Sequence, residues 1–486
     1  MSALAPTHCL TNRIPVEILT EIFLHVCEAH TPSHQPKSLQ EPIPLYIRPI
    51  DLSHVCRLWR DVALACARLW TCLLVADRHE HDLERFDVFV ERSKQLPLHM
   101  FISWTPTEDD RLDLEAVDWM RFSQIRDVFV HETLEKIISS GHRWASFFLF
   151  VETAGVMSCI LKRLSIVEVP LLRDVTLCTT FYRGVDAWLN EEAMEANHER
   201  WVECFPFPSS DLRTLYLDQT VPNSLDRTPY YPNLQSFTLD HVIGPSIPNF
   251  MRFLDTFPLL EALTLRTFQS ETVYGGFIPP PNGPLVELPL LRYFCISGLH
   301  PEDGEALFSH LRIPNVKIMD LDCRKRDNLQ WDTALSLLFA AYPDSSTSAL
   351  GSVQVLRIGR LECDSSLLSS FFQRLANLRV LVVDCLSDGW EGFLVHVQTT
   401  PHLPLLTTLV CPGISHEQLH DLVVERTMSD VPIQRVLVTQ DTRFSSSVVV
   451  STPRTVEVLW ELPSSEEGQI DASLGDLLAA YLRVEE

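Results

Sequence analysis

The chain has 486 residues, of which 46% are hydrophobic and 21% charged, a composition typical of a folded protein rather than a disordered one. Lys and Arg number 39 against 64 Asp and Glu, and the resulting net charge of −25 disfavours nucleic acid and anionic membranes as partners. The 13 cysteines form no Cys-x-x-Cys pair, which is typical of reduced, buried thiols. Because we find neither a secretory signal nor a membrane-spanning apolar run, we expect a cytoplasmic or nuclear protein.

The first predicted element is a short helix near the N-terminus. Apolar residues recur with helical spacing from Ile14 to Val26, and Pro15 falls in the first turn, where its missing N–H is tolerated. The helix should end near residue 30. The Pro-rich polar segment 31–44 then predicts a loop.

A second helical pattern covers residues 51–75. The apolar residues of its shared face are Leu52, Val55, Cys56, Trp59, Val62, Ala63 and Cys66. Leu69, Trp70 and Leu73 continue the apolar surface. Two helices cannot close a hydrophobic core by themselves, so apolar surface should remain for a partner or for the following domain.

Together the two helical segments resemble an F-box. The residues that carry this resemblance are Ile14-Pro15, Glu17-Ile18-Leu19, Val55-Cys56-Arg57-Leu58-Trp59-Arg60 and Arg68-Leu69-Trp70. The resemblance covers residues 12 to about 72. The loop between the helices is longer than in the compact motif, and Arg68 replaces the usual Pro. Long loops of this kind are similar to those in the many F-box proteins of mushroom-forming fungi.

The resemblance implies protein binding, because an F-box docks on the Skp adaptor of cullin–RING (SCF) ubiquitin ligases. By this resemblance the docking residues would be Ile14, Pro15, Ile18, Leu19, Ile22, Val55, Cys56, Trp59 and Trp70. The alternative is that these side chains only pack the helices against the next domain. An exposed surface around Ile22 and Trp59 would favour docking. The expected F-box-like domain spans residues 11–75.

We expect residues 76–143 to form a linker together with the first, atypical repeats. The segments 96–104 and 144–152 have the composition of strands, and 114–122 and 131–139 have helical patterns.

From residue 144 onward, one pattern of apolar-x-x-apolar-x-apolar recurs. Its first apolar residues stand at positions 172, 212, 234, 260, 291, 316, 353, 378, 406, 433 and 456. The mean interval of about 28 residues is typical of leucine-rich repeats. Intervening segments at 248–257, 331–342, 365–375 and 416–427 have helical spacing. We therefore expect an α/β repeat fold: a helical F-box, an irregular leucine-rich-repeat-like solenoid over 144–463, and a capping helix over 464–486.

The repeat departs from the standard form at the position of its buried Asn. This position holds Thr220, Val242, Phe268, Leu299, Leu361 and Leu386. An Asn ladder therefore cannot hold the backbone of successive repeats together.

The residue just after each predicted strand is often acidic. In the seven clearest repeats it is Asp218, Asp240, Arg266, Ser297, Asp322, Gly359 and Asp384. If these residues align, they form an acidic stripe that could attract a basic segment of a target protein. We take Asp218, Asp240, Arg266, Asp322 and Asp384 as candidate target-binding residues. The alternative is that Asp only serves here as a common strand terminator.

No catalytic motif stands out, so we expect no enzyme activity, no cofactor and no metal. There is no phosphate-binding Gly-rich loop and no Gly-x-Ser-x-Gly elbow, and the residues His79-Glu80-His81-Asp82 are more typical of a solvated turn than of a metal site. The sequence thus predicts a substrate-recognition subunit of an SCF-type ubiquitin ligase that binds a Skp adaptor and an unidentified, basic target protein. A scaffold outside any ligase and a Cys-dependent enzyme remain alternatives.

Overall fold

The computed structural model describes about half of the chain. The described residues are 14–28, 49–76, 82–104, 133–151, 154–179, 201–202, 211–219, 221–222, 231–244, 246–267, 269–270, 285–322, 331–340, 349–359, 365–384, 403–410, 421–422, 424–426, 433, 435–437 and 457–459. The predicted loop at 31–44, the helix at 114–122 and the capping helix at 464–486 lie outside these residues. The chain divides into two compact units, Met1–Tyr216 and Leu217–Glu486.

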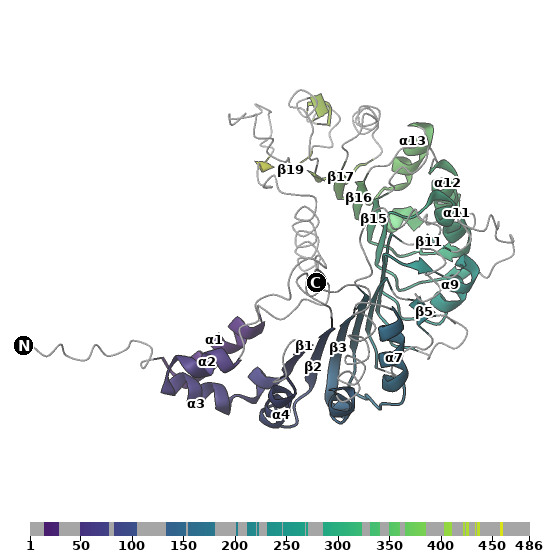
Figure 1. Cartoon of the computed structure of the whole chain (residues 1–486). Helices are drawn as coiled ribbons and strands as arrows, with labels where there is room; N and C mark the ends of the chain where they lie inside the picture. Colours follow the sequence, from purple (N-terminus) through teal and green to yellow (C-terminus); the bar gives the residue numbers. More distant parts are fainter. Residues whose placement is uncertain are drawn as a thin grey trace, which may run out of the picture. The chain divides into compact units, whose positions relative to one another are not determined.

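The first unit begins with a group of short helices (Figure 1). They are α1 (Val16–Glu28), α2 (Pro49–Val55), α3 (Arg57–Ala65) and the 3-10 helix η2 (Ala67–Trp70). The second predicted helix is therefore interrupted, because Cys56 (φ −159°, ψ 173°) and Cys66 (φ −88°, ψ 95°) adopt extended backbone conformations. Its last apolar residues form strand β1 (Cys72–Ala76) instead of helix. The backbone groups of β1 are satisfied by pairing with another strand.

A parallel sheet follows in the first unit. Strands β1, β2 (Leu98–Trp104), β3 (Trp144–Val151) and β4 (Asp174–Thr179) pair in chain order. Helix α4 (Asp82–Arg92) connects β1 to β2, and α7 (Ala154–Leu164) lies between β3 and β4 in the sequence. The strands predicted at 96–104 and 144–152 are confirmed. The sheet starts at Cys72, inside the range expected to be helical.

Strand β6 (Thr214–Asp218) contains the boundary between the units, and two short strands lie close to it in the sequence, β5 (Trp201–Val202) and β7 (Val221–Pro222). Nine further strands of the second unit pair in parallel and in chain order. They are β8 (Ser236–Asp240), β10 (Ala262–Arg266), β13 (Tyr293–Ser297), β15 (Ile318–Asp322), β16 (Val355–Gly359), β17 (Val380–Asp384), β18 (Thr408–Val410), β19 (Arg435–Leu437) and β20 (Glu457–Leu459). Each of the eleven predicted repeat strands is present, so the α/β class is confirmed.

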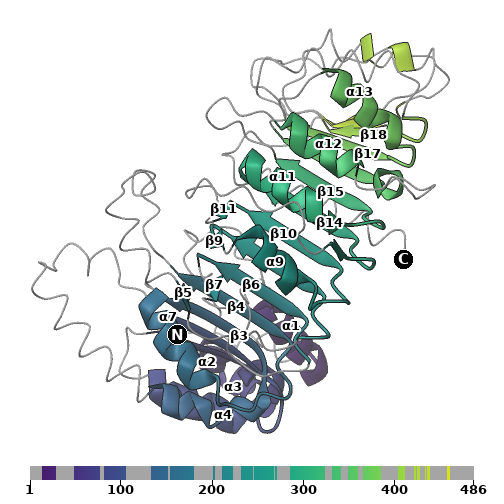
Figure 2. The same ribbon diagram turned by 90° about the vertical axis from the view of Figure 1, so that its right-hand side faces the viewer.

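Helices cover one face of the sheet of the second unit (Figure 2). These are α9 (Ile247–Leu254), α11 (Pro301–His310), α12 (Asp332–Ala340) and α13 (Ser365–Arg374). Alternate strand residues point toward them, and their side chains are at most 1% exposed: Phe237, Leu263, Phe294, Met319, Leu356 and Leu381. Burial of one such side chain stabilises the fold by about 1.5–3 kcal/mol. Within the described ranges, no helix combines the length and the apolarity that crossing a bilayer requires.

Two pairs of short parallel strands lie in loops of this unit. Strand β9 (Ile243–Gly244) pairs with β11 (Gln269–Ser270), and β12 (Val286–Glu287) pairs with β14 (Leu311–Arg312).

Four successive strands continue into a residue of left-handed backbone conformation. These residues are Gln219 (φ 54°), His241 (φ 49°), Thr267 (φ 47°) and Gly298 (φ 64°). Each donates its backbone N–H to the carbonyl that ends the next strand, at N–O distances of 2.9, 2.9, 2.6 and 3.2 Å to Asp240, Arg266, Ser297 and Asp322. This backbone ladder joins neighbouring repeats in a chain whose sequence lacks an Asn ladder.

Candidate docking surface and buried polar row

Helix α1 buries one side and exposes another. The buried residues Leu19, Phe23, Leu24 and Cys27 are at most 5% exposed, because they point toward the other helices of the unit. The exposed apolar residues are Val16 (49%), Ile18 (53%) and Ile22 (43%). An isolated exposed Ile is ordinary, but Ile18 and Ile22 are four residues apart and project from the same side of α1, where they form an apolar surface suited to protein contact. Val16, two residues before Ile18, projects from another side of the helix.

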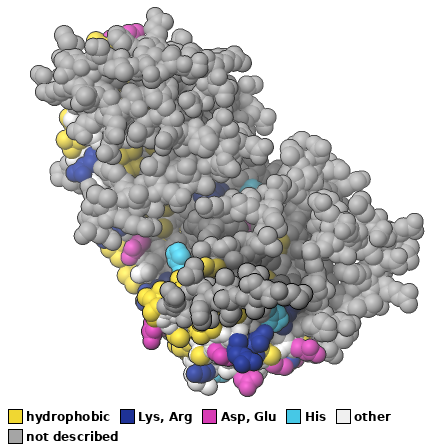
Figure 3. Space-filling view, turned by 90° about the vertical axis from the view of Figure 1, so that its left-hand side faces the viewer, with side chains coloured by type: hydrophobic (Ala, Val, Ile, Leu, Met, Phe, Trp, Pro, Cys, Tyr) yellow, Lys and Arg dark blue, Asp and Glu magenta, His cyan; other side chains and the backbone are white. Residues whose placement is uncertain are grey.

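Apolar side chains are also exposed on α2 and α3. Val55, the last residue of α2, is 60% exposed, and Leu64 near the end of α3 is 40% exposed. Helix α3 packs on α1 through Trp59, whose ring centroid lies 4.8 Å from that of Phe23. Figure 3 shows hydrophobic side chains gathered on one face of the molecule, with Lys and Arg side chains beside them. We call the exposed residues Ile18, Ile22 and Val55 the docking surface.

The structure divides the nine predicted docking residues into three groups. Pro15, Ile18, Ile22 and Val55 are exposed, and Ile14, Cys56 and Trp59 are half-buried. Leu19 and Trp70 are only 1% and 0% exposed, so these two side chains are corrected from contact residues to core residues. Helical spacing indicates which residues share a face, but it does not indicate which of them the next element will cover.

Trp70 packs between helices α3 and α4 and connects them. Its indole Nε1–H donates a hydrogen bond to the Ala63 carbonyl at 2.8 Å. The ring of Phe89, on α4, meets it edge-on at 5.0 Å, and the Arg92 guanidinium lies 4.3 Å from the centroid of the Trp70 ring. The docking surface therefore rests on a core shared between the helices and α4.

The predicted acidic stripe is aligned but is not open to solvent. Strand register places Asp240 beside Arg266, Arg266 beside Ser297, and Asp322 beside Ser297 and Gly359. Asp218, Asp240 and Asp322 are only 0%, 8% and 8% exposed. The expectation of an exposed acidic face is therefore corrected for these three residues, whose carboxylates lie within a buried polar row.

The other two candidate target-binding residues in this row are Arg266 and Asp384. Arg266 is half-buried at the end of β10. Asp384 ends β17 beside Gly359, and its side chain lies outside the described part of the structure.

Neighbouring groups compensate the charges of the buried carboxylates. Asp322 accepts a hydrogen bond from the Ser297 hydroxyl at 3.1 Å. Two residues before Asp322 on β15, the Asp320 carboxylate pairs with the Arg357 guanidinium at 3.3 Å. Both side chains are at most 14% exposed. The row thus contains paired charges rather than the free negative charge that would attract a basic partner.

His241 provides the positive charge at the start of the row. Its Nδ1 lies 2.9 Å from Asp240 Oδ1 and 3.4 Å from Asp218 Oδ1. Burial of the ring lowers its pKa, but the contacts with the two carboxylates outweigh burial and raise the pKa of His241 to about 9. The ring is therefore an imidazolium at neutral pH. No motif in the sequence singles out His241, although it directly follows a strand that ends in Asp.

Asp218, Asp240 and His241 also have the composition of a metal site. Their ligand atoms lie within 4.8 Å of one another, and they form such a group in the part of the chain that the structure describes. A metal ion would require the deprotonated imidazole. When no ion is bound, the raised pKa of His241 keeps a proton on the ring at neutral pH, and this proton supplies the balancing positive charge.

Cys295 is a buried thiol on β13, two residues before Ser297. It stands beside Asp320 in the strand register and is 2% exposed. Burial raises the pKa of the Cys295 thiol, so this residue lacks the lowered pKa that an activated Cys nucleophile needs.

Comparisons with known proteins do not assign this chain to a family. The sequence matches no family model, and it has no significant match among curated proteins. A function must therefore be inferred from the residues and their geometry.

Proposed function

We propose that this protein is a substrate-recognition subunit of an SCF-type cullin–RING ubiquitin ligase. The observation that carries the proposal is the exposure of Ile18, Ile22 and Val55 on helices that resemble an F-box. These residues stand at positions where the resemblance places contacts with a Skp adaptor. The same helices bury Leu19, Phe23 and Trp70, which hold the exposed side chains in place.

The exposure favours docking over purely internal packing. If the helices only packed against their own chain, Ile22 and Val55 would be covered, whereas they are 43% and 60% exposed. Covering the exposed part of one such side chain in a complex contributes about 1–2 kcal/mol, or roughly a factor of ten in affinity. Several of them together are enough to define an interface centre.

In this proposal the repeat units hold a target protein near the ubiquitin-charged enzyme. The protein contributes proximity and no bond chemistry of its own. The net charge of −25 favours a basic target, and it acts through the surface as a whole because the aligned carboxylates are buried. We place this activity in the cytoplasm or the nucleus.

The test is binding of the full chain to a purified Skp adaptor, measured by calorimetry. Ile18→Asp combined with Ile22→Asp should weaken binding at least about 100-fold, because two charges would enter an apolar contact. Ile166→Asp is the matched control, since Ile166 is 84% exposed in the loop after α7, and it should bind like the wild type.

Two results would contradict the proposal. One is a wild-type chain that does not bind the adaptor. The other is a double variant that binds as tightly as the Ile166→Asp control. Either result would favour a scaffold that works outside a ligase.

A further inference from the structure

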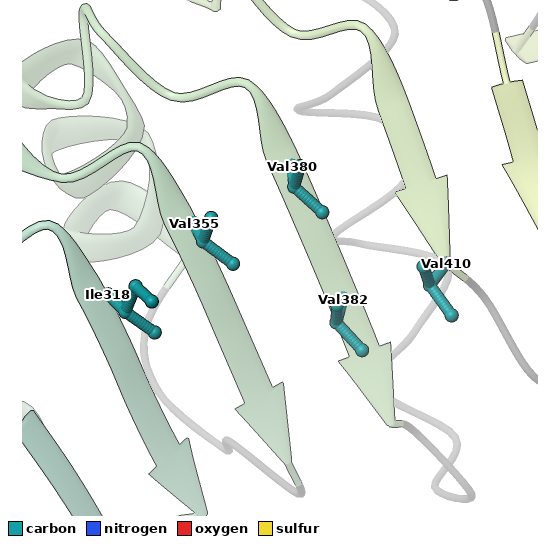
Figure 4. Packing of buried hydrophobic residues seen from close by; sticks show 5 residues of the cluster. All are labelled: Ile318, Val355, Val380, Val382 and Val410. Atoms are coloured by element: carbon teal, nitrogen blue, oxygen red, sulfur yellow. The ribbon is translucent and has the colours of Figure 1, made fainter. Parts of the chain in front are cut away.

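Five aliphatic side chains form an apolar cluster on the sheet of the second unit. They are Ile318, Val355, Val380, Val382 and Val410, with Tyr293 packed against them. Figure 4 shows them on strands β15 to β18, projecting from the face turned away from the helices. We call this face the inner face.

The inner face is covered. Exposures of the five side chains are 3%, 2%, 8%, 4% and 4%. A Val on an open sheet face keeps a substantial part of its surface in water. Among the described residues of this unit, the helices α9, α11, α12 and α13 all lie on the opposite face (Figure 2). Burial to 8% or less therefore requires another layer on the inner face.

The C-terminal segment of the chain has the composition of such a layer. Leu474, Leu477, Leu478, Tyr481 and Leu482 follow helical spacing and share one face, while Ala472, Asp476, Ala479 and Arg483 lie on the other. A helix over residues 471–486 would be about 24 Å long. The cluster spans the three strand spacings from β15 to β18, about 14 Å.

The segment is also long enough to reach the cluster. Strand β20 ends at Leu459, five strand spacings or about 24 Å from β15. The extended linker 460–470 can span about 36 Å. The chain can therefore return from the last strand across the inner face.

We propose that residues 471–486 dock as an amphipathic helix on the inner face, with their leucines on the apolar cluster. Docking removes this face from the surface that a target protein can contact. The inference is independent of the proposed ligase function. Because these exposures belong to a single chain, the other conceivable occupants are further segments of the same chain outside the described residues, such as 385–402 and 438–456.

The first experiment replaces Val382 by an aliphatic diazirine amino acid in the full-length chain. After irradiation, the cross-linked peptides are identified by mass spectrometry. The expected product is an intramolecular cross-link to a peptide within 471–486. Cross-links to another part of the chain, to a second copy, or to no peptide of this segment would overturn the proposal.

The second experiment measures thiol alkylation of Val382→Cys in the full chain. Leu477→Asp with Leu478→Asp should raise the labelling rate of Cys at position 382 at least about tenfold, because charges prevent docking on an apolar face. Ala472→Asp with Ala479→Asp adds the same charge on the opposite side of the predicted helix. This control should label at the rate of Val382→Cys alone. Equal rates in all three proteins would overturn the proposal.

Discussion

The ring of His241 lies between two buried carboxylates and stabilises both. Asp218 and Asp240 have 0% and 8% exposure, so their charges are expensive to bury without a counter-charge. The ring supplies it at 2.9 and 3.4 Å. The same residue has a left-handed backbone (φ 49°), which is uncommon for a residue with a side chain but more frequent for His than for most others. The side-chain pairing and the backbone ladder therefore depend on one position.

We predict that His241 makes stability pH-dependent above neutrality. Its folded pKa of about 9 exceeds the unfolded value of about 6.5, so its contribution is complete below pH 6.5 and is lost as pH rises through 9. The His241 contribution to the free energy of unfolding should fall by about 3 kcal/mol between pH 6.5 and 9.5 in the wild type. In His241→Gln this part of the fall should be absent, and only the smaller fall from ionisation of buried thiols such as Cys295 in the unfolded chain should remain. Urea unfolding at both pH values measures the difference.

The control for this prediction is His54→Gln, which removes an exposed imidazole from α2. It should keep the wild-type pH dependence. If His241→Gln and the wild type lose the same free energy between the two pH values, the ion pair does not contribute as described.

At the scale of the elements, a left-handed residue after each of four strands, β6, β8, β10 and β13, joins one repeat to the next. The positions Gln219, His241, Thr267 and Gly298 each donate a backbone hydrogen bond to the following strand end. Only Gly adopts this conformation without steric cost, and the cost for other residues is about 1–2 kcal/mol. Thr267 is the least suited of the four because its branched Cβ crowds the backbone.

We predict that Thr267→Gly stabilises the protein by about 0.5–1 kcal/mol, since removal of the strain exceeds the entropy that Gly gains in the unfolded chain. Gly298→Ala, at φ 64°, should destabilise it by a similar or larger amount. Denaturant unfolding measures both variants. Thr264→Gly, three residues earlier and buried inside β10, is the matched control and should destabilise. Destabilisation by Thr267→Gly equal to that control would contradict the strain argument.

At the scale of the whole molecule, the first unit combines a surface for binding with a core that holds it. Trp70 joins α3 to α4 through the Ala63 carbonyl, Phe89 and Arg92. The docking surface is formed by neighbouring residues that contribute little to this core. Stability and binding should therefore respond to different substitutions.

We predict that Trp70→Ala lowers the free energy of unfolding by about 3–5 kcal/mol, because it leaves a cavity and an unpaired carbonyl in the core. Ile22→Asp should change it by less than about 0.5 kcal/mol, as its side chain is 43% exposed. Thermal unfolding followed by circular dichroism measures both. A large loss of stability in Ile22→Asp would mean that this residue belongs to the core, and loss of adaptor binding in that variant could not then be assigned to docking.

The sequence by itself determined the positions of the repeat strands, because each needs only a local alternation of apolar side chains. It also determined the alignment of the strand-end residues, since equal strand lengths and a parallel register follow from the repeat. In segment 51–75 the local spacing of apolar residues predicted helix where the structure has a strand. Its helical spacing continued through Leu73, but the backbone hydrogen bonds of Cys72–Ala76 are made with β2, a strand more than twenty residues further along.

Only the tertiary structure decided which of the patterned residues are covered. Leu19 and Ile22 are one turn apart on the same helix, yet one is 1% and the other 43% exposed, because only the first points at neighbouring helices. Asp is usually solvated, and the sequence therefore predicts an exposed acidic row, whereas the fold encloses the row and pairs its carboxylates with His241 and Ser297. Burial and charge pairing depend on contacts between segments far apart in the chain, and periodicity along the sequence carries no information about them.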